Sequence, residues 1–274
     1  MRVGLVQLNG SDDPVANLSQ TIDLIKQAAH DGAAFVLTPE VTNIIGATRA
    51  KLNIVLRREA DDITLTALRG LAAELGIWIL IGSLAMKTGD ADGRFANRSF
   101  MIDPCGTVRA RYDKIHMFDV QVSKAETYQE SKNYRAGDTT SVVDLNGLNV
   151  GMSICYDIRF PHLYRDLAQA GADVIAVPAA MSPITGAAHI ETLLRARAIE
   201  TGCYLLMPSQ TGDHGTRSTW GHTMAVNPWG EVVFDMGTDV DFRCLDIDEN
   251  AVKEARAKIP SLYNTQPYQS PKNV

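Results

Sequence analysis

The sequence has few cysteines, no long apolar run and no block of basic residues. Its four cysteines in 274 residues are too few for the disulfide framework that holds small secreted domains together. The longest apolar runs, such as 172–180, are too short to cross a bilayer. The net charge of −6 argues against nucleic acid or an anionic membrane as the main partner. Because strand-like residues begin directly after Met1, we expect no secretory leader and a cytoplasmic protein with reduced thiols.

Strand-like segments alternate with helical patterns along the whole chain, which predicts an α/β fold with a largely parallel, buried sheet. The helical patterns cover 14–30, 59–75, 161–170, 187–201 and 249–258. Asx-Pro-x-Gly turns at 103–106 and 227–230 predict two antiparallel hairpins as well. Roughly eleven strands are many for one open sheet, so we expect two packed sheets with helices outside. We expect one domain over 1–274, in which 260–274 form a surface tail.

Cys155 differs from the other three cysteines in its surroundings. Cys105 lies in a predicted turn, whereas Cys203 and Cys244 lie at the start of or within apolar strands and are expected to pack as small hydrophobes. Cys155 ends the strand-like run 147–155 and is followed at once by a turn and a helix. In this setting a thiol can lie near backbone N–H groups and a positive helix end.

Strand alternation within 147–155 places Gly151, Ser153 and Cys155 on one face. A face of small and polar residues is expected to leave space for a substrate above it. On this local sequence alone, a nucleophile and a buried structural thiol remain equally consistent with the position of Cys155.

Two charged residues occupy unusual places in the pattern. Glu40 follows the apolar run 33–37, at the carboxyl end of a buried strand, where ligands bind in α/β sheets; the alternative is an ordinary solvated loop residue. Lys114 shares a predicted strand face with Val108, Ala110 and Tyr112, which is costly unless the lysine is paired or functional. The alternative is a lysine whose ammonium reaches solvent at the strand end. The six histidines have no zinc-type spacing, and we predict no metal site.

If Glu40, Lys114 and Cys155 lie together, they form a working set for nucleophilic catalysis. Glu40 can remove the thiol proton, while Lys114 and the Tyr156 N–H can stabilise a developing oxyanion.

The segments that carry these three residues resemble the motifs of the nitrilase (carbon–nitrogen hydrolase) superfamily. Pro39-Glu40, the segment 112–116 and the segment 155–161 match the glutamate, lysine and cysteine motifs in the same order and with similar separations. The resemblance covers nearly the whole chain. It implies a four-layer αββα sandwich and dimers or larger assemblies joined through helices. The resemblance also implies a second glutamate between the lysine and the cysteine. Glu130 matches this position best, and Glu126 is the competing candidate. For either glutamate the alternative is an ordinary charged loop residue.

Three further segments, 182–189, 194–200 and 220–231, resemble the Nit-type amidase branch of this superfamily. Within the branch the resemblance is to amidases of deaminated glutathione, with omega-amidases as near relatives. It implies a 2-oxo acid amide substrate that carries a carboxylate, and therefore a cationic residue near Cys155. Arg159 is the candidate, and Thr185 is expected to add a hydrogen bond. A structural ion pair of Arg159 with Asp157 or another acid is equally consistent. The loop 213–216 matches the branch only loosely, which leaves the acyl group open.

Our hypothesis from the sequence is hydrolysis of a small-molecule amide by water through a thioester on Cys155. In it, Glu130 orients Lys114 or the substrate. No cofactor is needed, because Lys114 and backbone dipoles supply the polarisation that a metal would provide. The alternatives are nitrile, carbamoyl or aliphatic-amide hydrolysis, or a regulatory or binding protein on the same scaffold.

Overall fold

The computed structural model describes residues 1–122 and 126–270, which form two six-stranded mixed sheets and two small hairpins. The first sheet has the order β16-β1-β2-β3-β4-β5 and the second β15-β14-β11-β10-β9-β8. The strands of the first sheet are β1 (Arg2–Gln7), β2 (Phe35–Leu37), β3 (Trp78–Lys87), β4 (Phe95–Ile102), β5 (Val108–Asp113) and β16 (Asp241–Asp246). Those of the second are β8 (Val142–Asp144), β9 (Asn149–Met152), β10 (Val174–Ala176), β11 (Tyr204–Met207), β14 (Met224–Val226) and β15 (Val232–Asp235). The hairpins pair β6 (Asp119–Gln121) with β7 (Thr127–Gln129), and β12 (Thr211–Asp213) with β13 (Ser218–Trp220).

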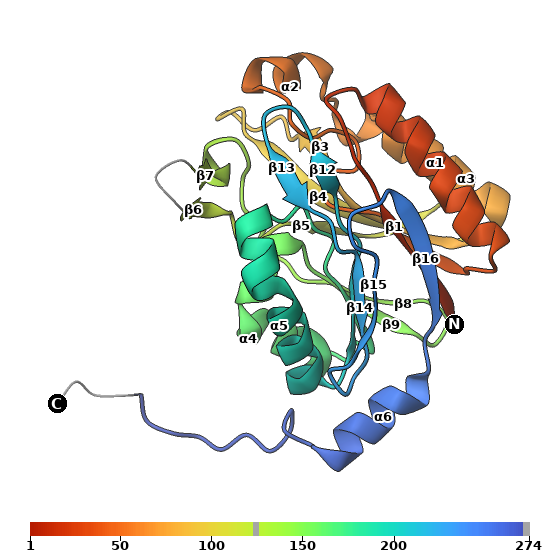
Figure 1. Cartoon of the computed structure of the whole chain (residues 1–274), viewed down its shortest axis with the longest axis vertical. Coiled ribbons are helices and arrows are strands. Elements are labelled where there is room, and N and C mark those ends of the chain that lie inside the picture. The colour runs from red at the N-terminus through yellow and green to blue at the C-terminus, as the bar shows by residue number, and fades with distance from the viewer. Residues whose placement is uncertain (123–125, 271–274) are drawn as a thin grey trace.

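Helices cover the outer face of each sheet (Figure 1). The helices α1 (Pro14–His30) and α3 (Ile63–Leu75) pack on the first sheet, and α4 (Pro161–Gln169) and α5 (Pro183–Thr201) pack on the second. The other helices are α2 (Arg49–Val55), α6 (Glu249–Lys258) and the 3-10 helices η1 (Glu59–Asp61), η2 (Glu130–Lys132) and η3 (Cys155–Arg159). The four layers confirm the predicted αββα sandwich.

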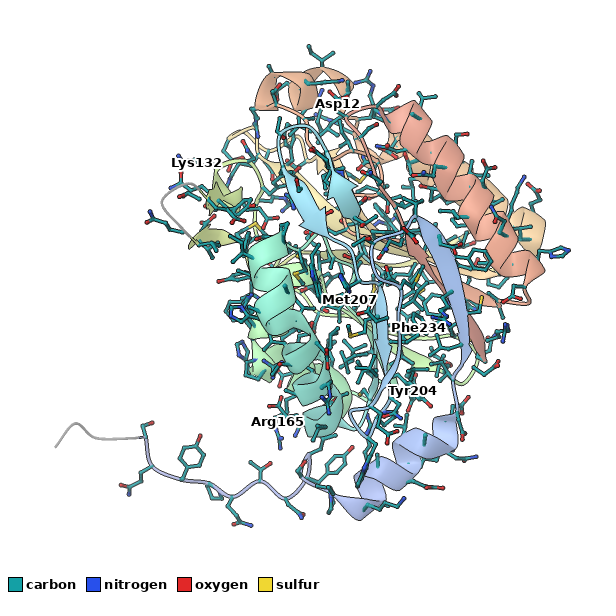
Figure 2. The ribbon with its side chains drawn as sticks, viewed as in Figure 1. Asp12, Lys132, Arg165, Tyr204, Met207 and Phe234 are labelled. Atoms are coloured by element: carbon teal, nitrogen blue, oxygen red, sulfur yellow. The ribbon has the colours of Figure 1, made fainter. Side chains whose placement is uncertain are left out.

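Strand alternation divides the core into two apolar clusters. On β2 and β3, Leu37 and Leu80 belong to the cluster that fills the space between the sheets and continues beneath α4 and α5. Val36 and Ile79, one residue earlier on each strand, face α1 and α3 instead. Figure 2 shows the interior filled with side chains such as Met207, while Lys132 projects from the edge.

The predicted helices correspond to observed ones, with differences at their starts. The predictions 14–30 and 249–258 agree with α1 and α6. The pattern over 59–75 is broken at Asp62, because its carboxylate accepts the Leu65 N–H at 2.8 Å and begins α3. Helix α5 begins at Pro183 and not at residue 187, because proline suits the first turn of a helix. Both Asx-Pro-x-Gly turns connect antiparallel strands as predicted, β4 to β5 and β14 to β15.

The region around 141–155 differs from the prediction of one long strand. It forms the β8–β9 hairpin, whose turn contains Asn146 and Gly147 at φ 60° and 112°. Strand β9 ends at Met152, so Cys155 begins η3 and does not end a strand.

The space predicted above Gly151 and Ser153 is also absent. A Cβ on Gly151 would lie 3.3 Å from the side chains of Leu167 and Ala172. The Ser153 hydroxyl lies 2.8 Å from that of Tyr164. The small residues on this face therefore make room for α4 and not for a substrate.

A further difference from the prediction concerns Val108, for which the sequence predicts the same strand face as Lys114. The pairing of β5 with β4 shifts register between Met101 and Ile102. As a result Val108 packs on the α1 and α3 side, whereas Ala110 and Tyr112 face the second sheet.

Two features concern the surface of the molecule. Residues 260–270 are exposed except for Leu262, whose carbonyl oxygen accepts hydrogen bonds from Arg165 and Gln169. Within the described part of the chain, none of the helices combines the length and apolar character needed to cross a lipid bilayer.

Candidate active site

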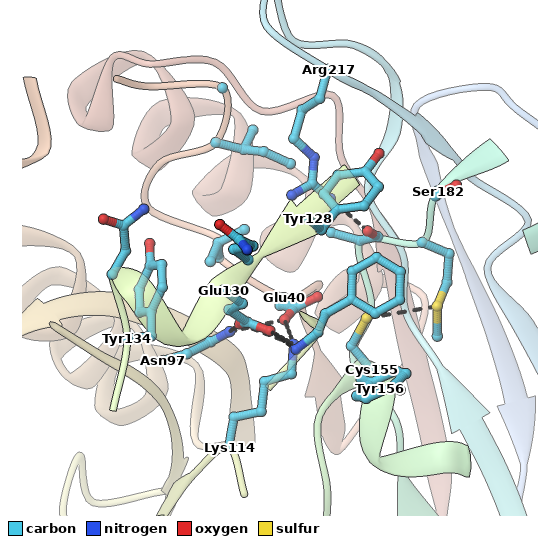
Figure 3. A pocket seen from close by; sticks show the side chains of 18 of the residues that line it. Glu40, Asn97, Lys114, Tyr128, Glu130, Tyr134, Cys155, Tyr156, Ser182 and Arg217 are labelled. Carbon is cyan, nitrogen blue, oxygen red and sulfur yellow. Dashed lines mark hydrogen bonds and ion pairs between the residues drawn. The ribbon is translucent and has the colours of Figure 1, made fainter. Parts of the chain in front are cut away.

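A cavity of about 300 Å³ lies beyond the carboxyl ends of β2 and β5, next to the start of η3 (Figure 3). Ligand sites in sheets with helices on their faces commonly lie at such strand ends. The structure places every candidate site residue from the sequence on the lining of this one cavity, namely Glu40, Lys114, Glu130, Cys155, Tyr156, Arg159 and Thr185.

Glu40 follows β2 and is buried, with 4% of its surface exposed. Its Oε1 atom accepts hydrogen bonds from Lys114 Nζ and Asn97 Nδ2, each at 2.9 Å. Burial raises the pKa of Glu40, but the charge and hydrogen bond of Lys114 outweigh it and bring the pKa below the ordinary value of 4.5. Glu40 is therefore an ionised carboxylate in a dry site and not a solvated loop residue.

The approach of Gly82 to the segment before Glu40 helps to position this carboxylate. Gly82 lies in β3, directly beside the backbone of Thr38 and Pro39. A Cβ at this position would collide with both carbonyl oxygens, so only glycine allows the strand to approach so closely.

Lys114 is the central cation of the site. Its Nζ atom lies 2.9 Å from Glu40 Oε1 and 2.9 Å from Glu130 Oε2, and the side chain is 2% exposed. Burial lowers the pKa of Lys114, but Glu130 and Glu40 raise it more, so the pKa lies well above 10.5. The ammonium is thus charged and held between two carboxylates, and it does not extend to solvent.

Glu130, and not Glu126, is the second carboxylate bound to Lys114. Glu130 Oε2 also accepts the Phe118 N–H at 2.7 Å. Glu126 Oε1 instead accepts hydrogen bonds from the hydroxyls of Tyr128 and Ser182, at 2.8 and 2.6 Å.

Cys155 has a left-handed backbone with φ 50°, an uncommon conformation for a residue with a side chain. Its N–H donates to the Pro178 carbonyl at 2.9 Å, and the residue is 7% exposed. Burial raises the pKa of the Cys155 thiol, and the Glu40 charge raises the pKa further, with a partial opposing effect of Lys114. The resting site therefore holds a neutral thiol close to an ionised carboxylate, and reaction at sulfur needs that carboxylate as a base.

Tyr156 follows Cys155 in the first turn of η3. The N–H groups of a first turn have no acceptor within their own helix. The Tyr156 N–H is therefore available to an anion that forms beside Cys155.

Asp157 joins the lysine segment to the cysteine segment. It is fully buried and accepts hydrogen bonds from the Tyr112 hydroxyl at 2.7 Å, the His116 N–H at 3.0 Å and the Ile154 N–H at 2.8 Å. Asp157 thus holds the end of β5 against the start of η3.

Arg159 does not form the ion pair with Asp157 that the sequence left open. Its guanidinium lies 3.3 Å from His189 Nδ1, and its Cζ atom lies 5.9 Å from the centre of the Tyr156 ring. No carboxylate of residues 1–122 or 126–270 forms an ion pair with Arg159. Thr185 lies on the same wall, in the first turn of α5.

Comparison with known proteins agrees with this geometry. The profile of a family described as carbon-nitrogen hydrolase matches residues 2–257. The chain belongs to the carbon–nitrogen hydrolase family. This membership confirms the resemblance seen in the sequence and shows that the chain is an enzyme of carbon–nitrogen bond hydrolysis.

Relatives of this hydrolase include two named amidases and one solved fusion protein. The deaminated glutathione amidase of Yersinia enterocolitica is 38% identical over 266 residues, which are 96% of this chain and 92% of that protein. The omega-amidase of Homo sapiens is 35% identical over 260 residues, which are 94% of this chain and 92% of that protein. The crystal structure of the C. elegans NitFhit protein superimposes with a TM-score of 0.89 at 32% identity. That superposition covers 97% of this chain and 65% of the longer NitFhit chain.

Sequence reasoning missed one charged residue that lines the cavity of this hydrolase. Arg217 lies in the connection between β12 and β13, and its guanidinium donates to the Ala180 carbonyl at 2.7 Å. The local sequence 213–218 shows no apolar periodicity that could orient its side chain. Only the hairpin, which the sequence analysis did not predict, brings Arg217 to the cavity. Among the described residues, no cluster of histidine, cysteine and acidic side chains is arranged to hold a metal ion.

Proposed function

We propose that this hydrolase cleaves small 2-oxo acid amides that carry a carboxylate, with deaminated glutathione as the substrate, through a thioester on Cys155. One observation carries the proposal: the Cys155 thiol, the ionised Glu40 and the Lys114 ammonium line one buried cavity in which Lys114 bonds directly to Glu40. The 38% identity to a deaminated glutathione amidase supports the choice of substrate.

In the first half-reaction, Cys155 Sγ bonds to the amide carbonyl carbon while Glu40 takes the thiol proton. Lys114 Nζ and the Tyr156 N–H hold the oxyanion of the tetrahedral intermediate. Collapse of this intermediate breaks the C–N bond, and the Glu40 carboxylic acid gives its proton to the departing amine. The acyl group remains on Cys155 as a thioester.

In the second half-reaction, Glu40 takes a proton from water as the water oxygen attacks the thioester carbonyl. Collapse breaks the C–S bond and releases the carboxylic acid, and the proton on Glu40 returns to Cys155 sulfur. Glu130 orients Lys114 through two hydrogen bonds, at 2.9 and 3.1 Å. Arg159 binds the carboxylate of the acyl group and Thr185 adds a hydrogen bond.

The second candidate substrate is 2-oxoglutaramate, the simple amide with the same acyl group. The 35% identity to a human omega-amidase favours it. Turnover of a panel containing deaminated glutathione, 2-oxoglutaramate, a nitrile, a carbamoyl compound and an aliphatic amide separates these activities.

Replacement of the nucleophile tests the mechanism. Cys155→Ala should abolish amine release and leave the unfolding temperature within a few degrees of wild type, whereas Cys105→Ala, at an exposed thiol, should keep full activity. Mass spectrometry of the quenched wild-type enzyme should find the acyl adduct on Cys155. The mechanism would be refuted if Cys155→Ala turned over near the wild-type rate, or if the adduct lay on Cys105. A wild-type protein without activity on any compound of the panel would favour a regulatory or binding role.

We also infer a single domain over 1–274 with 260–274 as its tail, in a cytoplasmic homodimer or larger assembly joined through helices. The four cysteines are free, as suits a reducing compartment. Helix α5 exposes Ile184 near its start and Ile199 near its end, at 55% and 52%. Trp229, at 51%, lines a surface hollow together with Ile199, and exposed apolar groups of this kind are typical of subunit interfaces. A monomer mass by light scattering at micromolar concentration would contradict the assembly.

A further inference from the structure

We propose that the cavity accepts an amide with two carboxylates, and that Arg217 is the specificity residue that binds the carboxylate on the leaving amine. This inference rests on the proposed function and names the substrate class of the same site more narrowly.

Arg217 has more hydrogen-bond donors than the protein satisfies. One guanidinium N–H₂ group donates to the Ala180 carbonyl. The Nε atom is buried and has no hydrogen-bond partner among the described residues. A guanidinium carries five N–H donors in a planar fork, and leaving a buried donor unpaired is costly. The Ala180 bond uses one guanidinium nitrogen, so other donors of the fork remain for a ligand in the cavity that Arg217 lines.

Arg217 has no direct ion-pair partner in the part of the chain that the structure describes. No carboxylate of residues 1–122 or 126–270 forms an ion pair with it. Glu126 lies behind the cavity residues Tyr128 and Ser182, whose hydroxyls donate to its Oε1 atom. The Arg217 Cζ atom lies 5.9 Å from the centre of the Tyr128 ring, which fixes the side chain on the wall of the cavity.

Arg217 is the second cation of this kind in the cavity. Arg159 also lines it and also has no paired carboxylate among the described residues. Lys114, by contrast, is already bound by Glu40 and Glu130. The cavity therefore presents two guanidinium groups, from η3 and from the β12–β13 connection, for two anionic groups of a ligand.

The two candidate substrates differ in this respect. 2-Oxoglutaramate has one carboxylate, on its acyl part, and Arg159 suffices for it. Deaminated glutathione has the same acyl part and a second carboxylate at the glycine end of its leaving amine. Two unpaired arginines therefore favour the larger substrate, and Arg217 is left for the glycine carboxylate.

The test compares three substrates: deaminated glutathione, the same compound with its glycine carboxylate converted to a neutral amide, and 2-oxoglutaramate. Arg217→Ala should lower kcat/KM for deaminated glutathione by about 10- to 100-fold, mainly through KM, as expected for a hydrogen-bonded ion pair. It should also remove the wild-type preference for the acid over its neutral amide. The loss on 2-oxoglutaramate should be at least tenfold smaller. Arg195→Ala, at an arginine that is half exposed on α5, is the matched control and should leave all three rates unchanged.

Several outcomes would overturn the inference and leave the amidase proposal standing. An equal loss of kcat on all three substrates would mean that Arg217 acts through Ala180 on the active-site loop. An unchanged KM of Arg217→Ala for deaminated glutathione would mean that Arg217 binds no second carboxylate. The same conclusion would follow if the wild type preferred 2-oxoglutaramate, or if it did not distinguish the acid from its neutral amide. Failure of the proposed function looks different, because the wild type would then turn over none of the three.

Discussion

Replacing Lys114 by methionine should show how strongly the site depends on one buried cation. Methionine has a similar length and no charge, so the variant leaves Glu40 and Glu130 without the ammonium that lies 2.9 Å from each. Breaking a buried ion pair costs about 3–5 kcal/mol. Since Glu130 is 14% exposed and keeps some solvation, we expect a loss near 3 kcal/mol. For a chain of this size that corresponds to a decrease in Tm of roughly 6–12 °C.

The loss should depend on pH in a defined direction. In the wild type, Lys114 outweighs burial and holds the pKa of Glu40 below 4.5. Without Lys114, burial dominates and the folded-state pKa of Glu40 rises above its unfolded value. A raised carboxylate pKa favours folding below the unfolded pKa, and this contribution is lost as pH rises through the folded pKa. The difference in Tm between variant and wild type should therefore narrow toward acid pH and widen toward pH 8.

Thermal unfolding followed by circular dichroism, from about pH 5 to pH 8, measures this difference. Lys132→Met is the matched control, because Lys132 is exposed in η2 two residues from Glu130, and it should unfold like wild type. In parallel, kcat of Lys114→Met should fall by at least about 10²–10³-fold, as on loss of one oxyanion donor. A Tm equal to wild type at pH 8, or a difference that does not vary with pH, would refute the role of Lys114 in neutralising the two carboxylates.

Two further predictions concern the thiol and the backbone. Burial and Glu40 raise the pKa of the Cys155 thiol, while the pKa of Glu40 lies below 4.5. The value of kcat/KM should therefore stay flat from about pH 5 to pH 8 and fall only in stronger acid, where Glu40 is protonated. An inflection near pH 7 would contradict a neutral thiol with an ionised base. Gly82→Ala should displace the Thr38 carbonyl and with it Glu40, which lowers kcat and destabilises the fold by about 1–3 kcal/mol. Gly70→Ala in α3 is the control, because a Cβ at residue 70 meets nothing within 4 Å. This variant should stabilise the fold by about 0.5–1 kcal/mol. Wild-type kcat in a folded Gly82→Ala protein would show that the close approach does not position Glu40.

The sequence predicted the layers of the fold well because apolar periodicity reports directly which face of an element is buried. It failed where several signals compete in a short segment. The run 141–155 is apolar enough for one strand, yet Asn146-Gly147 is a strong hairpin signal and divides it into β8 and β9. Similarly, Gly151 was taken to leave space for a ligand, although small residues equally allow a helix to approach.

The sequence predicts only part of the site, because some of its residues carry a local signal and others do not. Glu40 and Lys114 were recognisable because charges at the ends of apolar strands need an explanation. Asp157 and Arg217 make contacts with residues that lie far away in the sequence, such as Tyr112 and Ala180. No local sequence pattern reports such long-range contacts. Only the folded structure shows that Asp157 joins the lysine and cysteine segments and that Arg217 lines the cavity.

The uneven charge of the cavity has a consequence for turnover. Beside Cys155, two carboxylates surround one ammonium, so the innermost part of the site carries a net negative charge, while the arginines carry the positive charge. A neutral amide enters this inner part without repulsion. Hydrolysis then creates a new carboxylate next to the ionised Glu40, and like charges at short range in a dry site repel strongly. We therefore expect the acid product to bind this inner part of the site more weakly than the amide does.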